Sequence, residues 1–320
     1  MRAPAFWTEG GTFAHLLAPL GLLYTIGGRW RRRAATPWRA PVPVVCIGNL
    51  TVGGTGKTPT AIAIARRLVV AGRRPVIVSR GYRGHLEGPV RVDPSAHSAA
   101  DVGDEPLLLA EAAPTIVAKD RLAGVRAALD LGDVIVLDDG FQDPRLAHDL
   151  ALVVVDGAAG FGNGRVLPAG PLREPVADGL ARADAVVVVG DGPGNGAVAT
   201  DRPLLRARLV PTESSLRFRG RRALAFAGIG RPEKMFATLR EIGAEVVAAH
   251  GFPDHHAYDE NDVAGLVEEA AILRAEPVTT RKDWVRLPAS ARPMVEVVDV
   301  DLVFADEDAV MRRLRELSCA

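Results

Sequence analysis

Residues Thr51–Thr58 read TVGGTGKT. This segment follows the apolar run Val44–Ile47 and precedes Pro59–Ala71, in which Ala, Ile, Leu and Val recur at helical spacing. A strand, a glycine-rich turn and a helix in this order are the context of a phosphate-binding P-loop. Backbone N–H groups of such a turn point inward, and the N-terminus of the helix adds the positive end of its dipole. The segment therefore predicts an α/β fold that binds a nucleotide.

Each residue type in the predicted loop has a physical role. The three inner glycines allow the backbone conformations that the turn needs. Lys57 is expected to reach the β and γ phosphates, and the hydroxyl of Thr58 to ligate Mg²⁺. The general motif begins with glycine where this chain has Thr51; a glycine-rich turn with an incidental lysine is the alternative. The predicted nucleotide-binding residues are Thr51, Val52, Gly53, Gly54, Thr55, Gly56, Lys57 and Thr58.

A second predicted strand, Val134–Leu137, runs directly into Asp138 and Asp139. A P-loop needs another Mg²⁺ anchor at the end of a neighbouring strand. Asp138 is expected to hold the metal or its water, and Asp139 to support it or bind directly. Apolar strands that end in Asp are common in α/β proteins, so this prediction depends on the P-loop beside it. Together the two motifs predict ATP and Mg²⁺ as cofactors.

From residue 43 onward, short β-branched runs alternate with helical patterns. This alternation predicts a P-loop NTPase-like, doubly wound α/β/α sheet over residues 41–215. A second, shorter series of strands and helices predicts a smaller α/β unit over residues 216–320, with its last strand at Val295–Val300. Residues 1–40 are expected to form a separate N-terminal segment.

The N-terminal segment contains the apolar stretch Phe13–Ile26, followed at once by Arg29–Arg33. Fourteen apolar residues are too few to span a bilayer, which needs about 20. A signal peptide would carry its basic cluster before the apolar part, which argues against export. Two interpretations remain: a helix that lies in the interface of an anionic leaflet, and a core helix with a solvated basic end.

The chain has 320 residues, with 39 basic and 39 acidic side chains. This balance gives no overall field that would attract nucleic acid, so no nucleic-acid partner is expected. Cys46 and Cys319 lie far apart in the sequence, and Cys46 sits in an apolar run. We therefore expect a reducing compartment and no disulfide framework.

Transfer of a phosphate to an alcohol needs a carboxylate or His near the acceptor hydroxyl. Two segments supply candidates: Gly103–Pro106 (GDEP) and Phe252–His256 (FPDHH). The acids of the first could instead simply begin a helix. The adjacent His residues of the second have no further His or Cys at zinc-ligand spacing, which favours a base or phosphate-stabilising role. The loop Gly160–Glu174 and the strand exit Ser79–Gly84 add Arg and Tyr side chains that suit a phosphosugar.

The chain resembles the tetraacyldisaccharide 4'-kinases of lipid A biosynthesis from Pro4 to about Pro288, and the Thr at the first P-loop position is typical of that family. The blocks that carry the resemblance occur in one order: VCIGNLTVGGTGKTP (45–59), SRGY (79–82), GDEP (103–106), KDR (119–121), DDGFQ (138–142), GNGRVLPAGPLRE (162–174), AFAGIGRPEKMF (225–236), FPDHH (252–256) and TTRKDWV (279–285).

The resemblance implies transfer of the γ-phosphate of ATP to the 4'-hydroxyl of a tetraacyldisaccharide 1-phosphate, which yields lipid IVA. It implies a peripheral position on the anionic cytoplasmic face of the inner membrane. Asp104 resembles the general base, which one His of FPDHH assists; we favour His255, and His256 stays open. The implied roles of the others are catalysis for Lys57, a Mg²⁺ contact for Glu105, and substrate contacts for Tyr82, Arg121 and Arg173.

Three other classes of protein share parts of this pattern. A partitioning-type regulatory ATPase carries a signature lysine where this chain has Val52. A GTP-binding switch needs N-K-x-D, and Thr280–Asp283 has the wrong spacing. A lipid-binding module without catalysis would have no need of Lys57, Thr58, Asp104 and Asp138. The sequence leaves acyl-chain preference, oligomeric state and the extent of lobe closure open.

Overall fold

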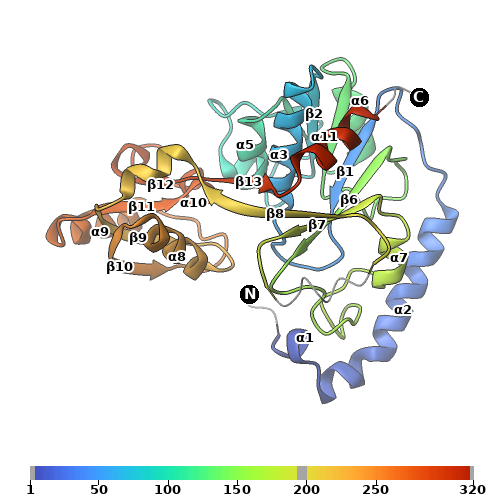
Figure 1. Cartoon of the computed structure of the whole chain (residues 1–320), viewed down its shortest axis with the longest axis horizontal. Helices are drawn as coiled ribbons and strands as arrows, with labels where there is room; N and C mark the ends of the chain where they lie inside the picture. The colour runs from blue at the N-terminus through green and yellow to red at the C-terminus, as the bar shows by residue number, and fades with distance from the viewer. Residues whose placement is uncertain (1–3, 193–199, 318–320) are drawn as a thin grey trace.

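The computed structural model describes residues 4–192 and 200–317, so Cys319 lies outside the described residues. Two sheets form the framework (Figure 1). The larger has nine strands in the order β13-β8-β7-β6-β1-β5-β2-β4-β3, and the smaller has four in the order β10-β9-β11-β12. The predicted α/β fold with a P-loop NTPase-like sheet and a second α/β unit is confirmed.

The centre of the large sheet is parallel. Its strands are almost completely buried, as expected where helices cover both faces. Alternate residues of one strand face two cores: Val45 and Ile47 pack with the first helix layer, Val44 and Cys46 with the second. The parallel strands are β1 (Val44–Gly48), β2 (Pro75–Ser79), β4 (Thr115–Val117), β5 (Val134–Asp138), β6 (Leu150–Asp156) and β7 (Ala185–Val189).

Helices cover both faces of this sheet. One layer contains α3 (Lys57–Val70), α5 (Asp104–Ala110) and α11 (Glu307–Arg315), and the other contains α6 (Arg121–Ala128) and α7 (Val176–Leu180). The doubly wound arrangement places the carboxyl ends of β1 and β5, with the two predicted phosphate-site motifs, next to each other.

The edges of the large sheet are antiparallel. The short strand β3 (Val90–Arg91) pairs with β4, and α4 (Ala99–Val102) precedes α5. At the opposite edge, β13 (Val300–Phe304) pairs with β8 (Leu204–Pro211), and these two strands run together toward the smaller unit (Figure 1).

The C-terminal segment differs from the expectation for the smaller unit. The sequence placed residues 300–317 there, but β13 joins the large sheet and α11 packs on α3. Leu302 and Phe304 of β13 are buried in the core of that sheet, which explains the pairing. The predicted strand at 295–300 is shorter and ends at Val298. The division into domains near residue 215 stays a prediction.

The smaller sheet is parallel throughout, with helices on both faces. Its strands are β9 (Arg222–Ala227), β10 (Glu245–Gly251), β11 (Glu276–Thr280) and β12 (Glu296–Val298). Its helices are α8 (Pro232–Ile242), α9 (Glu260–Ile272) and α10 (Arg281–Trp284), with 3-10 turns η2 (Glu213–Phe218) and η3 (Arg292–Met294).

The N-terminal segment forms α1 (Phe6–Glu9) and the long α2 (Thr12–Ala34), which lies against the large unit (Figure 1). Gly21 faces inward, where a Cβ atom would lie 2.9 Å from the carbonyl oxygen of Val166. Arg29 forms an ion pair with Asp178 of α7. Within residues 4–192 and 200–317, no helix is both long enough and apolar enough to cross a bilayer.

Candidate active site

The glycine-rich segment forms the turn between β1 and α3. Gly56 adopts φ 94°, a left-handed conformation that favours glycine, and α3 begins at the next residue. A Cβ atom at Gly56 would also approach the side chain of Val189 to 3.3 Å. The turn therefore presents Lys57 and Thr58 in the first helical turn at the carboxyl end of the sheet.

Lys57 faces the aspartate pair at the end of β5. Its Nζ lies 3.7 Å from Oδ1 of Asp139, and Arg173 Nη1 donates to the two oxygens of the same carboxylate at 3.1 and 3.2 Å. Burial lowers the pKa of Lys57, although Asp139 opposes this. Burial also raises the pKa of Asp139, but the charges of Lys57 and Arg173 outweigh it and hold that pKa below its ordinary value. Asp139 is thus an ionised centre between two cations.

Asp138 has a different environment. It is 5% exposed, Ser79 Oγ donates to its Oδ2 at 3.4 Å, and its Oδ1 is buried without a hydrogen-bond partner among the described residues. Burial and the nearby charge of Asp139 raise the pKa of Asp138 to about 7. A buried carboxylate oxygen without a donor suits a divalent cation, since Mg²⁺ takes oxygen ligands. Thr58 and Glu105 line the same cleft, and their oxygen atoms also suit Mg²⁺. Like Oδ1 of Asp138, Oε2 of Glu105 is buried without a hydrogen-bond partner among the described residues.

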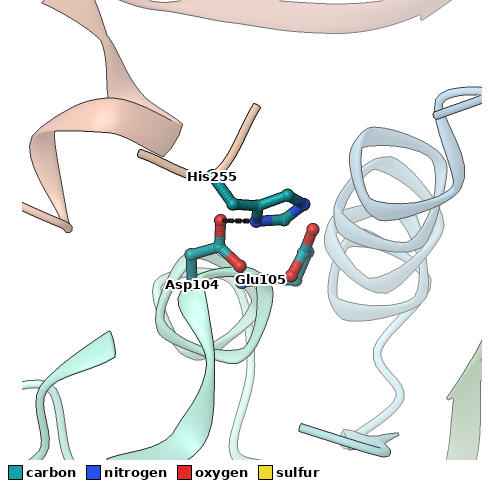
Figure 2. Close-up of side chains that lie close together, drawn as sticks. All are labelled: Asp104, Glu105 and His255. Atoms are coloured by element: carbon teal, nitrogen blue, oxygen red, sulfur yellow. Dashed lines mark hydrogen bonds and ion pairs between the residues drawn. The ribbon is translucent and has the colours of Figure 1, made fainter. Parts of the chain in front are cut away.

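The structure brings the GDEP and FPDHH segments together across the two units. Asp104 begins α5 and is 3% exposed, and its Oδ2 lies 2.9 Å from Nδ1 of His255 in the loop after β10 (Figure 2). Glu105 lies beside them, so one atom of each of the three residues falls within 4.8 Å of the others. His255 has φ 61°, an uncommon left-handed conformation for a non-glycine residue. The loop is therefore shaped to hold this imidazole against Asp104.

The second histidine of FPDHH faces elsewhere. His256 Nε2 forms a hydrogen bond of 2.8 Å with Asp262 Oδ2 at the start of α9. His255, rather than His256, is therefore the imidazole next to Asp104. Tyr82 stands edge-on to the His255 ring, with 6.0 Å between the ring centroids, and is 62% exposed in the cleft.

Arg121 and Arg173 both contact Asp139. Arg121 Nη2 donates to its carbonyl oxygen at 2.5 Å, and Arg121 Nε is buried without a partner among the described residues. Both guanidinium groups are held beside the P-loop, where an anionic phosphate would meet them.

Sequence reasoning missed two cations at this site. Lys282 of α10 donates to Glu105 Oε1 at 2.7 Å and lies 3.7 Å from Asp104 Oδ2. Arg286 is almost completely buried, and its Nε lies 3.7 Å from the same oxygen. Lys282 lies within the family block at 279–285, and Arg286 directly follows it. The sequence alone assigned no role to a residue of that block.

The two acids of this pair have pKa values shifted in opposite directions. Burial raises the pKa of Asp104, but the hydrogen bond from His255 and the charge of Lys282 hold that pKa well below its ordinary value. Burial and the neighbouring Asp104 raise the pKa of Glu105 above its ordinary value. Because ionised Asp104 can only accept, His255 Nδ1 carries the proton, and the Lys282 ammonium, 3.4 Å away, is oriented toward the free Nε2.

The P-loop, the aspartate pair and the groups from the smaller unit line one open cleft. Its walls include residues of the turn, of α5 and of the loop after β10, so the site lies between the two units. Such a cleft can bind a nucleotide on one side and an alcohol on the other, with Asp104 and His255 near the meeting point.

Comparison with known proteins shows close relatives. The model of a family described as Tetraacyldisaccharide-1-P 4'-kinase matches residues 13–318. A tetraacyldisaccharide 4'-kinase of Rhodospirillum centenum is 53% identical over 326 residues, which cover 99% of this chain and 97% of that protein. Another, of Gluconacetobacter diazotrophicus, is 53% identical over 320 residues, which cover 98% and 97%. The crystal structure of LpxK from Aquifex aeolicus in complex with ATP is similar with a TM-score of 0.75 and 26% identity, covering 96% of this chain and 99% of that one.

Proposed function

This chain belongs to the tetraacyldisaccharide-1-phosphate 4'-kinase family, and on that premise we propose how its own residues carry out the reaction. It is a kinase that transfers the γ-phosphate of ATP to the 4'-hydroxyl of a tetraacyldisaccharide 1-phosphate, and the product is lipid IVA. The observation that carries the assignment of roles is the hydrogen bond between Asp104 and His255 in a cleft that the P-loop also lines.

The P-loop binds the triphosphate. Backbone N–H groups of residues 52–58 and the N-terminus of α3 point their partial positive charge at the phosphate oxygens. Lys57 exchanges its ion pair with Asp139 for the β and γ phosphates, which offer the ammonium the negative charge that the carboxylate offers here.

Asp138, Thr58 and Glu105 would hold Mg²⁺, because each offers an oxygen and two of them have a buried oxygen without a partner among the described residues. Asp139 is paired with Lys57 and Arg173 and supports this set. When bound, Mg²⁺ neutralises the charge that develops on the phosphate oxygens.

Asp104 accepts the proton of the 4'-hydroxyl. A carboxylate with a lowered pKa is a weak base, but phosphoryl transfer proceeds through a loose transition state that depends mainly on positioning and charge. The ionised acceptor is always available at neutral pH, and His255 fixes its orientation through the 2.9 Å hydrogen bond. Tyr82, beside His255, contacts the sugar of the lipid, and Arg121 and Arg173, beside Asp139, contact the phosphates of the substrates.

The α2 helix places the protein on the anionic cytoplasmic surface of the inner membrane. Its inner side, which includes Gly21 and Thr25, packs on the protein, while Leu16, Leu23 and Trp30 are 65–73% exposed. Exposed apolar side chains beside a basic cluster are typical of a helix that lies in the membrane interface. The acylated substrate is reached there without leaving the bilayer.

The reaction can be tested directly with γ-labelled ATP and purified tetraacyldisaccharide 1-phosphate in detergent. We expect the label to appear in the lipid only in the presence of the chain, and ATP turnover to rise on addition of the lipid. ATP turnover that is independent of the lipid would contradict the proposal and favour a regulatory ATPase.

A further inference from the structure

The lysines of this chain are few and share one location. Of the 39 basic residues only Lys57, Lys119, Lys234 and Lys282 are lysines, and all four line the cleft. A lysine ammonium is a compact charge on a flexible stem, which suits a phosphate that changes position. Arginines such as Arg121 and Arg173 line the same cleft, so the contacts of each lysine, rather than its presence there, decide its role.

Lys282 and Lys57 each face a carboxylate, from opposite sides of the cleft. Lys57 lies 3.7 Å from Asp139, and Lys282 lies 2.7 Å from Glu105. In each case the partner carboxylate belongs to the group that would hold or support Mg²⁺. A divalent cation at these carboxylates supplies the counter-charge that the ammonium supplies here, which frees both lysines for a new anionic partner.

The backbone that carries Lys282 is tightly fixed. The next residue, Asp283, is completely buried and accepts hydrogen bonds from the backbone N–H of Gly228 at 2.8 Å and from Tyr258 Oη at 3.0 Å. Arg286 donates to the same carboxylate at 2.6 Å and to the carbonyl oxygens of Gly228 and His256. This network connects α10 with the loop of His255, so Lys282 moves only through its own side chain.

We propose that Lys282 is a second phosphate-binding lysine, which leaves Glu105 when Mg²⁺ and ATP enter and donates to oxygens of the γ-phosphate. Lys57 then neutralises the phosphate from the P-loop and Lys282 from the smaller unit, on the side of Asp104 and the acceptor. The inference rests on the proposed function, because it requires ATP to bind with its γ-phosphate between these two walls. The alternative is an ion pair that only holds the two units together.

The γ-phosphate distinguishes these two roles. ADP lacks that group, so the loss of a residue that binds it weakens the binding of an ATP analogue but not of ADP. The loss of an ion pair between the units changes the binding of both nucleotides alike. The change Lys282→Met keeps the length of the side chain and removes the charge, and Lys282→Arg keeps the charge.

The experiment measures dissociation constants by titration calorimetry for the full chain with Mg²⁺, using ADP and the β,γ-imido analogue of ATP. We expect Lys282→Met to weaken binding of the analogue by about tenfold relative to ADP, the size of one charge-assisted hydrogen bond. Lys282→Arg should retain more than half of the wild-type preference for the analogue. Arg281→Met removes a neighbouring charge that pairs with Asp299, and should leave the preference unchanged.

If Lys282→Met changes the dissociation constants of ADP and of the analogue equally, or changes neither, the inference is overturned. The kinase assignment remains intact in both cases. The same holds if Arg281→Met lowers the preference as strongly. A wild-type chain that binds neither nucleotide would instead overturn the proposed function itself. Thermal unfolding midpoints of the variants separate a binding change from a loss of folded protein, and Lys282→Gln, which also removes the charge, replaces the Met variant if that variant does not fold.

Discussion

Oδ2 of Asp104 and Nδ1 of His255 lie 2.9 Å apart although 151 residues separate them in the chain. The first residue begins a helix on the large sheet, and the second lies in the loop after strand β10 of the small one. The pair therefore exists only when the two units meet across the cleft. The proposed base is therefore complete only where nucleotide and lipid are held in the same closed site.

The role of Asp104 can be tested by Asp104→Asn. We expect turnover to fall by about 10² to 10⁴ fold, the usual range for a lost general base, while nucleotide affinity changes little. The amide keeps the shape of the side chain but accepts no proton. Asp101→Asn is a matched control, because Asp101 caps the preceding helix and bonds Ser98. Initial rates with labelled ATP decide the matter, and near-normal phosphorylation by Asp104→Asn would reject the assignment.

The adjacent histidines provide an internal comparison. His255→Asn removes the hydrogen bond to Asp104, and asparagine tolerates the positive φ at this position better than most residues. We expect turnover to fall by about 10 to 100 fold, because the carboxylate loses its orienting partner. His256→Asn removes a contact with Asp262 outside the site, and should change turnover less than about threefold. Equal losses in both variants would argue against a specific role of His255.

The P-loop and the aspartate pair could be predicted because their signals are local. Glycines, Lys57 and Thr58 lie within one turn, and Asp138 directly follows an apolar strand. Parallel strands then bring the two motifs to one edge of the sheet without any further information.

Other features depend on contacts that the sequence does not display. The strand at 300–304 shows an ordinary alternating pattern, and only its partner β8 assigns it to the large sheet. The choice between His255 and His256 is made by the backbone conformation of one loop. Lys282 and Arg286 come near Asp104 only through the packing of α10. The family block at 279–285 drew attention to this segment, but it did not indicate that its cations contact Asp104.

Asp138 is expected to lower the stability of the folded chain although the reaction needs its carboxylate. Because its pKa is raised to about 7, the ionised carboxylate that exists above that pH costs the folded chain stability relative to the unfolded chain. Asp138→Asn removes this cost, so we expect the free energy of unfolding without metal at pH 8 to rise by roughly 1–3 kcal/mol. Turnover should fall at least 100-fold, since a proposed Mg²⁺ ligand is lost. Urea unfolding tests the expected gain in stability, and rate measurements on the same sample test the expected loss of turnover. A variant that is less stable than the wild type would contradict the proposed cost of ionised Asp138.

His148 is expected to make stability depend on pH. Burial lowers its pKa to about 4, and its Nε2 is buried without a partner among the described residues. In the unfolded chain this imidazole binds a proton with a pKa near 6.5. Protonation therefore favours the unfolded chain below that pH, and the free energy of unfolding decreases as the pH falls from about 6.5 toward 4. Between pH 7 and 5 the loss amounts to about 2 kcal/mol. Urea unfolding of His148→Gln should show a smaller decrease over this range, whereas His85→Gln, at an exposed position, should match the wild type.

The membrane role of α2 depends on its outward apolar face. Leu16, Leu20 and Leu23 are 52–73% exposed and lie one helical turn apart. Replacing all three with Ser should weaken binding to anionic phosphatidylglycerol vesicles by more than about tenfold, because each buried leucine contributes on the order of 1–3 kcal/mol. Val69→Ser/Val70→Ser removes exposed apolar surface from the end of α3, and should leave sedimentation with vesicles unchanged. If the leucine variant still sediments with the vesicles as the wild type does, the helix does not anchor the enzyme, and the basic cluster after it becomes the remaining candidate.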